Sequence, residues 1–255
     1  IIALASVLAD FDHGAIEIIP KSFATGYDEE DRALLRELYR VSGKPIELNI
    51  LTPTPQNPMG WQDTLEFCNE AAEQGIRLHP QFTTNKLELH LKLSDTFVFD
   101  EMLVWREVLT QAEPERSRCL ADPSWRARMQ VEWDSDDGRA VAFDLGDLEV
   151  EDVTDPDHSA WVGRTIRDLA EEAGKGTLDT FLDLSLAENL ELNFRTSFNE
   201  TAHQFIQHVV ESGLKNPIAM AGSSDGGAHL ASFTGADYST RLLSEWVPRT
   251  VTLEH

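Results

Sequence analysis

The stretch of residues 222–229, Gly-Ser-Ser-Asp-Gly-Gly-Ala-His, carries the side chains of this chain that are best suited to chemistry. A carboxylate such as Asp225 can hold a metal-bound water and take its proton, which a hydrolase needs in order to make hydroxide near neutral pH. Gly226 and Gly227 permit a tight turn with positive φ directly after it. The same residue types also form surface turns that have no chemistry, and the stretch alone leaves both interpretations open.

The elements before this stretch would place it at the end of a strand. Residues 217–222 form a short apolar run that predicts a buried strand. Three earlier runs of the same kind predict strands at residues 14–20, 45–51 and 76–82, with amphipathic helices between them at 28–41 and 61–74. Strands separated by single helices favour parallel pairing through right-handed crossovers. Catalytic groups of such α/β proteins gather at the carboxyl ends of the strands.

The alternation of strands and helices is interrupted in the middle of the chain. We interpret residues 86–160, with an acidic run at 134–137 and a β-like patch at 140–153, as an insertion or lobe. Helices are predicted again at 165–173, 178–187 and 200–211, with a fourth strand candidate at 190–194. The predicted organisation is therefore 1–85 as middle β/α units of a barrel, 86–160 as the lobe, and 161–255 as the last β/α units.

Two α/β architectures are compatible with five such strands. They are too few for an eight-stranded TIM-like (β/α) barrel, but they suffice for an incomplete one that holds only the later strands. The chain starts without Met inside an apolar helical pattern and stops where a helix is expected to begin, so we expect it to be part of a longer polypeptide. An open doubly wound sheet is the rival, but no strand is followed by a GxGxxG or Walker-type loop.

Composition and charge narrow the class of protein. Apolar residues make up 41% and charged residues 26% of the 255 residues, as in ordinary soluble globular proteins. The net charge of −24 would repel nucleic-acid phosphates and anionic lipids, so neither is an expected partner. No stretch is long and apolar enough for a membrane span, and no signal peptide is recognisable, so a cytoplasmic location is the default. Homo-oligomerisation is compatible with the sequence but is not indicated by it.

The remaining Cys, His and Ser residues form no complete motif. Cys68 and Cys119 lack the spacing of a zinc site or of a disulfide framework. His203 and His208 are five residues apart and so do not share a helix face. A serine nucleophile is disfavoured because no GxSxG elbow is present.

The carboxyl-terminal part of the chain resembles the amidohydrolase superfamily, in the branch of the N-acyl-D-amino-acid deacylases. The resemblance rests on the segments that begin at Gly163 (GRTIRDLA), Gly176 (GTLDTFLDL), Ser224 (SDGGAHL), Tyr238 (YSTRLL) and Trp246 (WVPR). It implies a TIM-like barrel, one or two divalent metals, usually zinc, and hydrolysis of an amide in a small N-acyl substrate.

The resemblance also implies roles for individual residues. Asp225 takes the position of the aspartate that orients and deprotonates the attacking water and contacts the metal, while Ser224 and His229 lie in the substrate-lining loop. His79 falls near the place of a metal-ligating histidine. Asn49 falls where relatives carry another, and an amide is a poor zinc ligand. The family's His-x-His pair is not found in this chain.

Three functions follow as expectations. The first is metal-dependent deacylation of N-acyl-D-amino acids or similar N-acyl compounds. The second is hydrolysis of a cyclic amide, because function depends on the site rather than on the fold. The third is a metal-poor barrel that binds without catalysis, which Asn49 favours.

Overall fold

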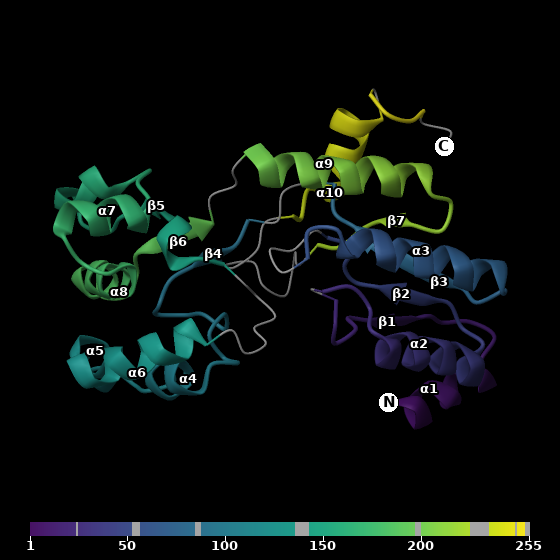
Figure 1. The fold of residues 1–255 in the computed structure, drawn as a ribbon, viewed down its shortest axis with the longest axis horizontal. Coiled ribbons are helices and arrows are strands. Elements are labelled where there is room, and N and C mark those ends of the chain that lie inside the picture. The colour runs from purple at the N-terminus through teal and green to yellow at the C-terminus, as the bar shows by residue number, and fades with distance from the viewer. Residues whose placement is uncertain are drawn as a thin grey trace. The chain divides into compact units, whose positions relative to one another are not determined.

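The computed structural model describes residues 1–23, 25–52, 57–84, 88–135, 143–196, 200–224, 235–247 and 249–252. The described residues form two compact units (Figure 1). The first is built from the residues up to 84 and those from 200 onward, and the second from residues 88–196. Within the described residues, no helix has the length and apolar character that crossing a membrane requires.

The first unit is a parallel sheet with helices, as the alternation of strands and helices predicts. Its strands are β1 (Ile16–Ile18), β2 (Ile46–Leu48), β3 (Leu78–Phe82) and β7 (Met220–Ala221), in the spatial order β1-β2-β3-β7. All three strand pairs are parallel. Its helical segments are α1 (Ile2–Val7), η1 (Leu8–Asp10), α2 (Glu29–Ser42), α3 (Gly60–Glu73), α9 (Glu200–Lys215), α10 (Tyr238–Arg241) and η4 (Leu242–Trp246). The α/β class is confirmed, and the described strands form an open sheet of four rather than a closed barrel.

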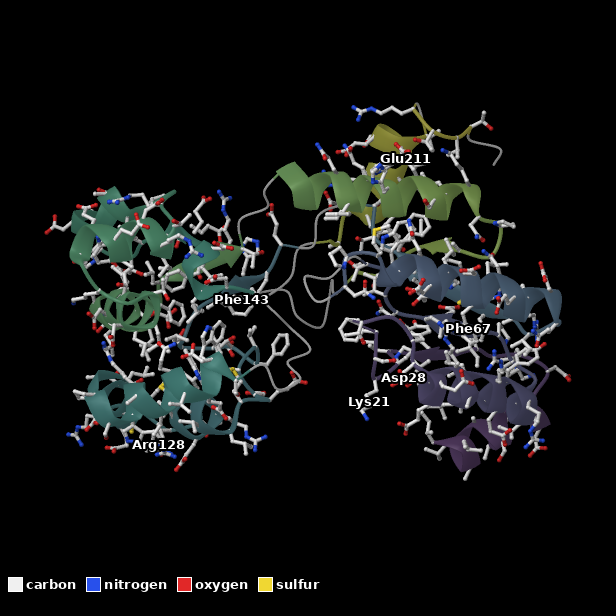
Figure 2. All side chains as sticks on the ribbon, in the orientation of Figure 1. Lys21, Asp28, Phe67, Arg128, Phe143 and Glu211 are labelled. Atoms are coloured by element: carbon white, nitrogen blue, oxygen red, sulfur yellow. The ribbon has the colours of Figure 1, made fainter. Side chains whose placement is uncertain are left out.

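Local signals explain where α2 begins and ends. The Asp28 side chain, labelled in Figure 2, accepts a hydrogen bond of 2.9 Å from the backbone N–H of Asp31 at the start of the helix. Gly43 ends it in the left-handed conformation, at a φ of 65°. Leu35 and Leu38 are fully buried on one face. The helix therefore joins β1 to β2 and covers the sheet between them.

One face of the sheet is apolar and packs on the helices. Ile46, Leu48 and Leu78 project from β2 and β3 into a core shared with α1, α2 and α3. Phe67 of α3, labelled in Figure 2, is among the largest fully buried side chains of this core. Burial raises the pKa of the neighbouring Cys68 thiol to about 12, so this cysteine stays protonated and is part of the packing.

Helix α9 lies directly on β3. Its residues Val209 and Val210 share a second core with Phe82, the last residue of that strand. At Gly213 a Cβ atom would come within 2.4 Å of the Phe82 ring, so only glycine allows this approach. The close contact fixes the helix that leads into β7.

The second unit contains a small antiparallel sheet, β4 (His90–Leu91), β6 (Asn193–Thr196) and β5 (Leu148–Asp152), in the order β4-β6-β5. Its helical segments are α4 (Leu103–Leu109), α5 (Glu115–Ala121), α6 (Pro123–Asp134), η2 (Leu145–Asp147), η3 (Pro156–Trp161), α7 (Ile166–Ala173) and α8 (Thr177–Ala187). One sheet face is buried among these helices through residues such as Val150 and Phe194.

This unit corrects the expectation for residues 161–196. The strand candidate at 190–194 was predicted as a parallel barrel strand, but β6 pairs antiparallel with β4 and β5. Helices α7 and α8 pack in the same core, so the described lobe extends through residue 196 rather than ending at 160. The physical reason is that an apolar strand pattern reports burial and not which sheet the strand joins.

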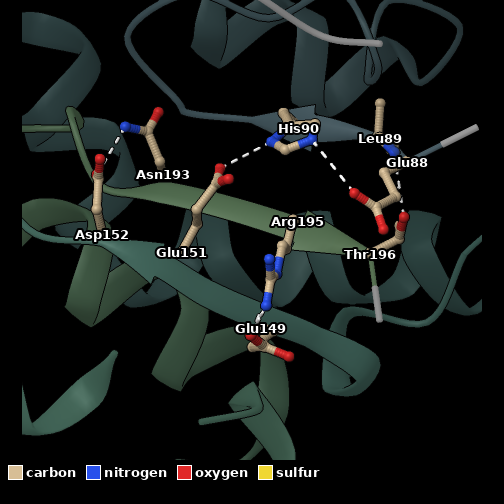
Figure 3. A network of polar contacts seen from close by, with 9 residues as sticks. All are labelled: Glu88, Leu89, His90, Glu149, Glu151, Asp152, Asn193, Arg195 and Thr196. Carbon is tan, nitrogen blue, oxygen red and sulfur yellow. Dashed lines mark hydrogen bonds and ion pairs between the residues drawn. The ribbon is translucent and has the colours of Figure 1, made fainter. Parts of the chain in front are cut away.

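The opposite face of the small sheet carries charged side chains that pair across the strands (Figure 3). Arg195 of β6 donates to Glu149 of β5, and its pKa is raised chiefly by this hydrogen bond. His90 of β4 lies 2.7 Å from Glu151 through Nδ1 and 4.0 Å from Glu88 through Nε2. The pairs of Arg195 with Glu149 and of His90 with Glu151 join different strands, as is typical of a sheet with one buried and one polar face.

A buried carboxylate makes this unit sensitive to acid. Glu188 is 2% exposed and accepts hydrogen bonds from the His158 ring and from the backbone N–H groups of Thr154 and Asp155. Burial by itself raises the pKa of Glu188, but these hydrogen bonds outweigh it and hold the pKa below the ordinary value. A carboxylate with a lowered folded pKa stabilises the fold above its unfolded pKa of about 4.3, and that contribution is lost as the pH falls through the folded value.

We therefore expect the unfolding free energy of the second unit to fall as the pH is lowered from about 5 toward 3. Glu188→Gln should remove this part of the pH dependence and cost about 1–3 kcal/mol at pH 7, because buried N–H groups lose a charged acceptor. Urea unfolding at a series of pH values measures both effects. The exposed Glu171→Gln on α7 is the control, and an equal pH profile for wild type and Glu188→Gln would refute the assignment.

Candidate active site

The sheet of the first unit has a polar face opposite its helix-covered face. Glu17, Glu47 and His79 are register partners across β1, β2 and β3, so their side chains form a row on that face. Their neighbours in each strand, such as Ile46 and Leu48, point into the apolar core. Alternation of this kind is what a sheet needs when one face packs on helices and the other faces a polar site.

Gln81 connects this row to the carboxyl ends of the strands. Its Nε2 donates a hydrogen bond of 2.9 Å to Glu47 Oε2, from the strand position two residues beyond His79. Gln81 is 7% exposed, and its register partner is Met220 of β7. A Cβ at Gly222 would lie 3.0 Å from Gln81 Oε1, so the backbone after β7 passes close to this amide. The polar groups therefore continue upward to the edge where β2, β3 and β7 end.

At that edge, the residues after β2 and β7 are joined by a side-chain hydrogen bond. The Ser223 hydroxyl donates to Asn49 Oδ1. Because β3 lies between β2 and β7, this hydrogen bond crosses over the end of β3. Strands two places apart in a flat sheet are about 9.5 Å apart, which is too far for two short side chains, so the segments after these strands bend toward each other.

Ser223 adopts a backbone conformation that is unusual for a residue with a side chain. Its φ of 67° is in the left-handed region, which costs about 1 kcal/mol for a residue other than glycine. Such residues persist where the surrounding structure holds them and cluster at functional sites. The conformation lets the hydroxyl reach Asn49.

Two substitutions at this position are expected to differ. Ser223→Ala loses the hydrogen bond to Asn49, worth about 1 kcal/mol, and keeps the backbone strain. Ser223→Gly loses the same hydrogen bond but relieves the backbone strain. Its unfolding free energy should therefore stay within about 1 kcal/mol of wild type. It should also exceed the unfolding free energy of Ser223→Ala by about 1 kcal/mol. Urea unfolding of both variants measures this. Equal stabilities would show that the positive φ is not a real constraint.

Comparison with known proteins gives little similarity. No family model matches the chain, and no curated protein matches it. A match among solved structures is the crystal structure of N-acyl-D-glutamate deacylase from Bordetella bronchiseptica, in complex with zinc and a phosphonate inhibitor that mimics the tetrahedral intermediate. The two chains are 15% identical with a TM-score of 0.40, over 87% of this chain and 34% of that one. The chain thus spans about a third of the length of that protein, and a likeness of this degree defines neither its fold nor its activity.

The residues predicted for the site are placed only in part. Asp225, the predicted catalytic and metal-binding residue, and His229, predicted to line the substrate, lie outside the described residues. Ser224, the other predicted substrate residue, is exposed and directly follows Ser223 at the carboxyl edge. The roles of Asp225 and His229 therefore stay predictions. Strand β7, which precedes them in the sequence, lies within the predicted strand at 217–222.

His79, the second predicted metal ligand, lies lower in the sheet than the resemblance suggests. It is the second residue of β3, three residues before the end of the strand, or about 10 Å below the edge. Its Nδ1 lies 3.0 Å from the carbonyl oxygen of Ile218, a contact that orients the ring and leaves Nε2 as the nitrogen open to a ligand. A metal bound by His79 would lie against the polar face beside Glu47 rather than at the strand ends.

The described residues do not fit a metal site by themselves. Within the described ranges, no three His, Cys, Asp or Glu side chains converge in a way that could hold a metal ion. Asn49 offers an amide oxygen that already accepts the Ser223 hydrogen bond.

Sequence reasoning missed the residues that connect the site. Glu47 and Gln81 were not singled out, and Ser223 was considered only as a serine nucleophile, although Glu47 of β2 and Asn49 directly after it alternate with apolar neighbours. That period of two was a usable signal for a polar inner face. The pairing of Ser223 with Asn49 had no such signal, because it joins residues 174 positions apart.

Proposed function

We propose that this chain belongs to a metal-dependent hydrolase of amide bonds of the amidohydrolase type, acting on N-acyl-D-amino acids or similar small N-acyl compounds. In this proposal the sheet of the first unit is a part of a TIM-like barrel, and its polar face is the inner face. The metal is a divalent cation, most often zinc in enzymes of this kind.

The polar carboxyl edge of the parallel sheet is the observation that supports the proposal. Asn49 after β2, Gln81 near the end of β3, and Ser223 after β7 lie at one edge of the sheet and are joined by hydrogen bonds to each other or to Glu47. Parallel α/β enzymes carry their reacting groups at this edge. Asp225 is only two residues after Ser223 in the sequence, and we propose that its carboxylate lies at the same edge.

The predicted site residues have different roles in the proposed reaction. Asp225 accepts a proton from the attacking water, and its carboxylate would also bind the metal. His79 would be a second ligand only for a metal that lies below the strand ends, beside Glu47. Ser224 and His229 contact the N-acyl substrate. Bound divalent metal would lower the pKa of the attacking water and polarise the acyl carbonyl.

A binding protein without catalysis is the second candidate. It is favoured by Asn49, a neutral amide where a histidine ligand was expected, and by the lack of a converging ligand set among the described residues. The two candidates differ in metal content and in turnover.

Metal analysis and a substrate panel separate the candidates. We expect about one divalent metal or more per chain after purification, and release of free amino acid from N-acetyl-D-amino acids. Hydantoins serve as the cyclic-amide controls, and activity on these alone would reject deacylation. Neither bound metal nor hydrolysis of any compound in the panel would favour the binding protein and refute the hydrolase.

A further inference from the structure

Asn49 is fixed from two sides at the carboxyl edge. Its backbone N–H donates a hydrogen bond of 3.1 Å to the carbonyl oxygen of Ile18, which extends the contact between β1 and β2 past the last residue of β2. Its side-chain oxygen accepts the Ser223 hydroxyl from the segment after β7. The side chain is half-buried, so its amide group is held at the surface of the site.

The hydrogen bond from Ser223 decides what the Asn49 amide can offer to a ligand. A primary amide has one acceptor oxygen and two donor hydrogens on nitrogen. Oδ1 keeps a second lone pair after accepting from Ser223, but this hydrogen bond sets the orientation of the amide and leaves both Nδ2 hydrogens for a ligand. The amide is therefore a positioned donor suited to an oxygen atom of the ligand, and its neutral oxygen is a weak ligand for zinc.

The charged residues on the face that carries Asn49 favour a neutral oxygen atom of the ligand over an anionic one. Glu47 lies two residues earlier in the chain on the same polar face, and Glu17 lies beside Glu47 in the same row. Two carboxylates on the same face disfavour an anion there and leave a neutral carbonyl as the better-suited ligand. Gln81 donates to Glu47 and so partly offsets its charge without providing a cation.

We propose that Asn49 donates through Nδ2 to the neutral carbonyl oxygen of an N-acyl group, and that Ser223 is the positioning residue that sets the orientation of the amide. This assignment rests on the proposed function, because it takes an N-acyl compound as the ligand. It gives Asn49 a role in substrate recognition in place of the metal ligation that its position suggested.

Nuclear magnetic resonance of the full, ¹⁵N-labelled chain tests the assignment. The probe is N-acetyl-D-alaninamide, which is neutral and carries the acyl carbonyl, and acetate is the anionic comparison. The side-chain amide signals of Asn49 are identified by their loss in Asn49→Asp. We expect the neutral probe to shift these signals and Asn49→Asp to weaken its binding about 10-fold or more, because a donor to the carbonyl is replaced by a repelling carboxylate.

A matched control is available in the same unit. Asn69 of α3 is exposed, and its Oδ1 also accepts a side-chain hydrogen bond, of 2.9 Å from Asn216. Asn69→Asp makes the same chemical change away from the polar face and should leave probe binding unchanged. Ser223→Ala should shift the Asn49 amide signals in the free protein and weaken probe binding several-fold, a combination that a purely structural role of Ser223 would not produce.

The outcomes separate this inference from the proposed function. Three results would overturn the inference. They are equal binding of the neutral probe by wild type and Asn49→Asp, larger shifts of the Asn49 signals with acetate than with the neutral probe, and no binding of the neutral probe. Asn49-dependent binding without hydrolysis of any N-acyl compound by the metal-supplemented protein supports the carbonyl subsite and refutes the hydrolase. Hydrolysis of an N-acyl compound at the same rate by wild type and Asn49→Asp supports the hydrolase and refutes the carbonyl subsite.

Discussion

Replacement of Asp225 by Asn is expected to lower kcat for an N-acyl-D-amino acid by about 10²–10⁴-fold, the usual contribution of a general base. The substitution keeps the size of the side chain and removes the proton-accepting carboxylate. Because the amide can still donate and accept hydrogen bonds, KM should change less than kcat. Steady-state kinetics with the same metal supplement for both proteins measures the difference.

Asp63→Asn provides the control for this variant. Asp63 is an exposed residue in the first turn of α3, so the same chemical change there should leave kcat within about twofold of wild type. Circular dichroism should show both variants folded. A kcat for Asp225→Asn equal to that of the control would remove Asp225 from the mechanism.

Replacement of Trp105 by Ala is expected to destabilise the second unit by about 3–5 kcal/mol. Trp105 is fully buried, stacks on Phe99 with ring centroids 4.3 Å apart, and donates from its indole N–H to the Met129 carbonyl at 3.1 Å. Its loss leaves a cavity in the core and removes the indole hydrogen bond to the Met129 carbonyl. Since a domain is stable by only about 5–15 kcal/mol, this is a large fraction of the total.

Hydrogen exchange followed by mass spectrometry locates the effect of Trp105→Ala. Peptides from residues 88–135 and 143–196 should exchange faster, while peptides from α2 and α3 should keep their protection, because those helices belong to a separate core. Val131→Ala on α6 is the control, since Val131 is 73% exposed. Loss of protection in α2 and α3 to the same degree would contradict the division into two units.

The strands and helices of the first unit could be predicted from the sequence because their signals are local. Apolar alternation marks β2, and Asp28 and Gly43 mark the limits of α2. The parallel pairing followed from the single helices between the strands. Each of these features depends on residues within a few positions of each other.

The second unit was harder to predict because its signals are weak or non-local. Helix α6 has Met129 as its buried residue, so the apolar periodicity that would reveal it is nearly absent. Strand β6 has a clear strand pattern, but its antiparallel partners, β4 and β5, lie far away in the sequence. Choice of partner is set by tertiary packing, which a single sequence does not display.

The candidate site was predicted by its place in the fold more than by its residues. The segment after β7 was expected at a carboxyl strand edge, and Ser223 lies there. The predicted strand at 76–82 already placed His79 three residues before the strand end, and β3 does end at Phe82. The resemblance alone put His79 near the position of a metal ligand.

Crystals of the protein soaked with zinc would test the central claim, that the reacting groups lie at the carboxyl edge of the parallel sheet. Diffraction data collected at the zinc absorption edge should show a metal about 2.0–2.2 Å from a carboxylate oxygen of Asp225, on the side of the sheet that carries Glu47 and Asn49. The position of the same peak relative to His79 Nε2 would decide whether that residue is a ligand. An Asp225 side chain on an outer surface, away from the ends of β2 and β3 and without metal, would contradict the account.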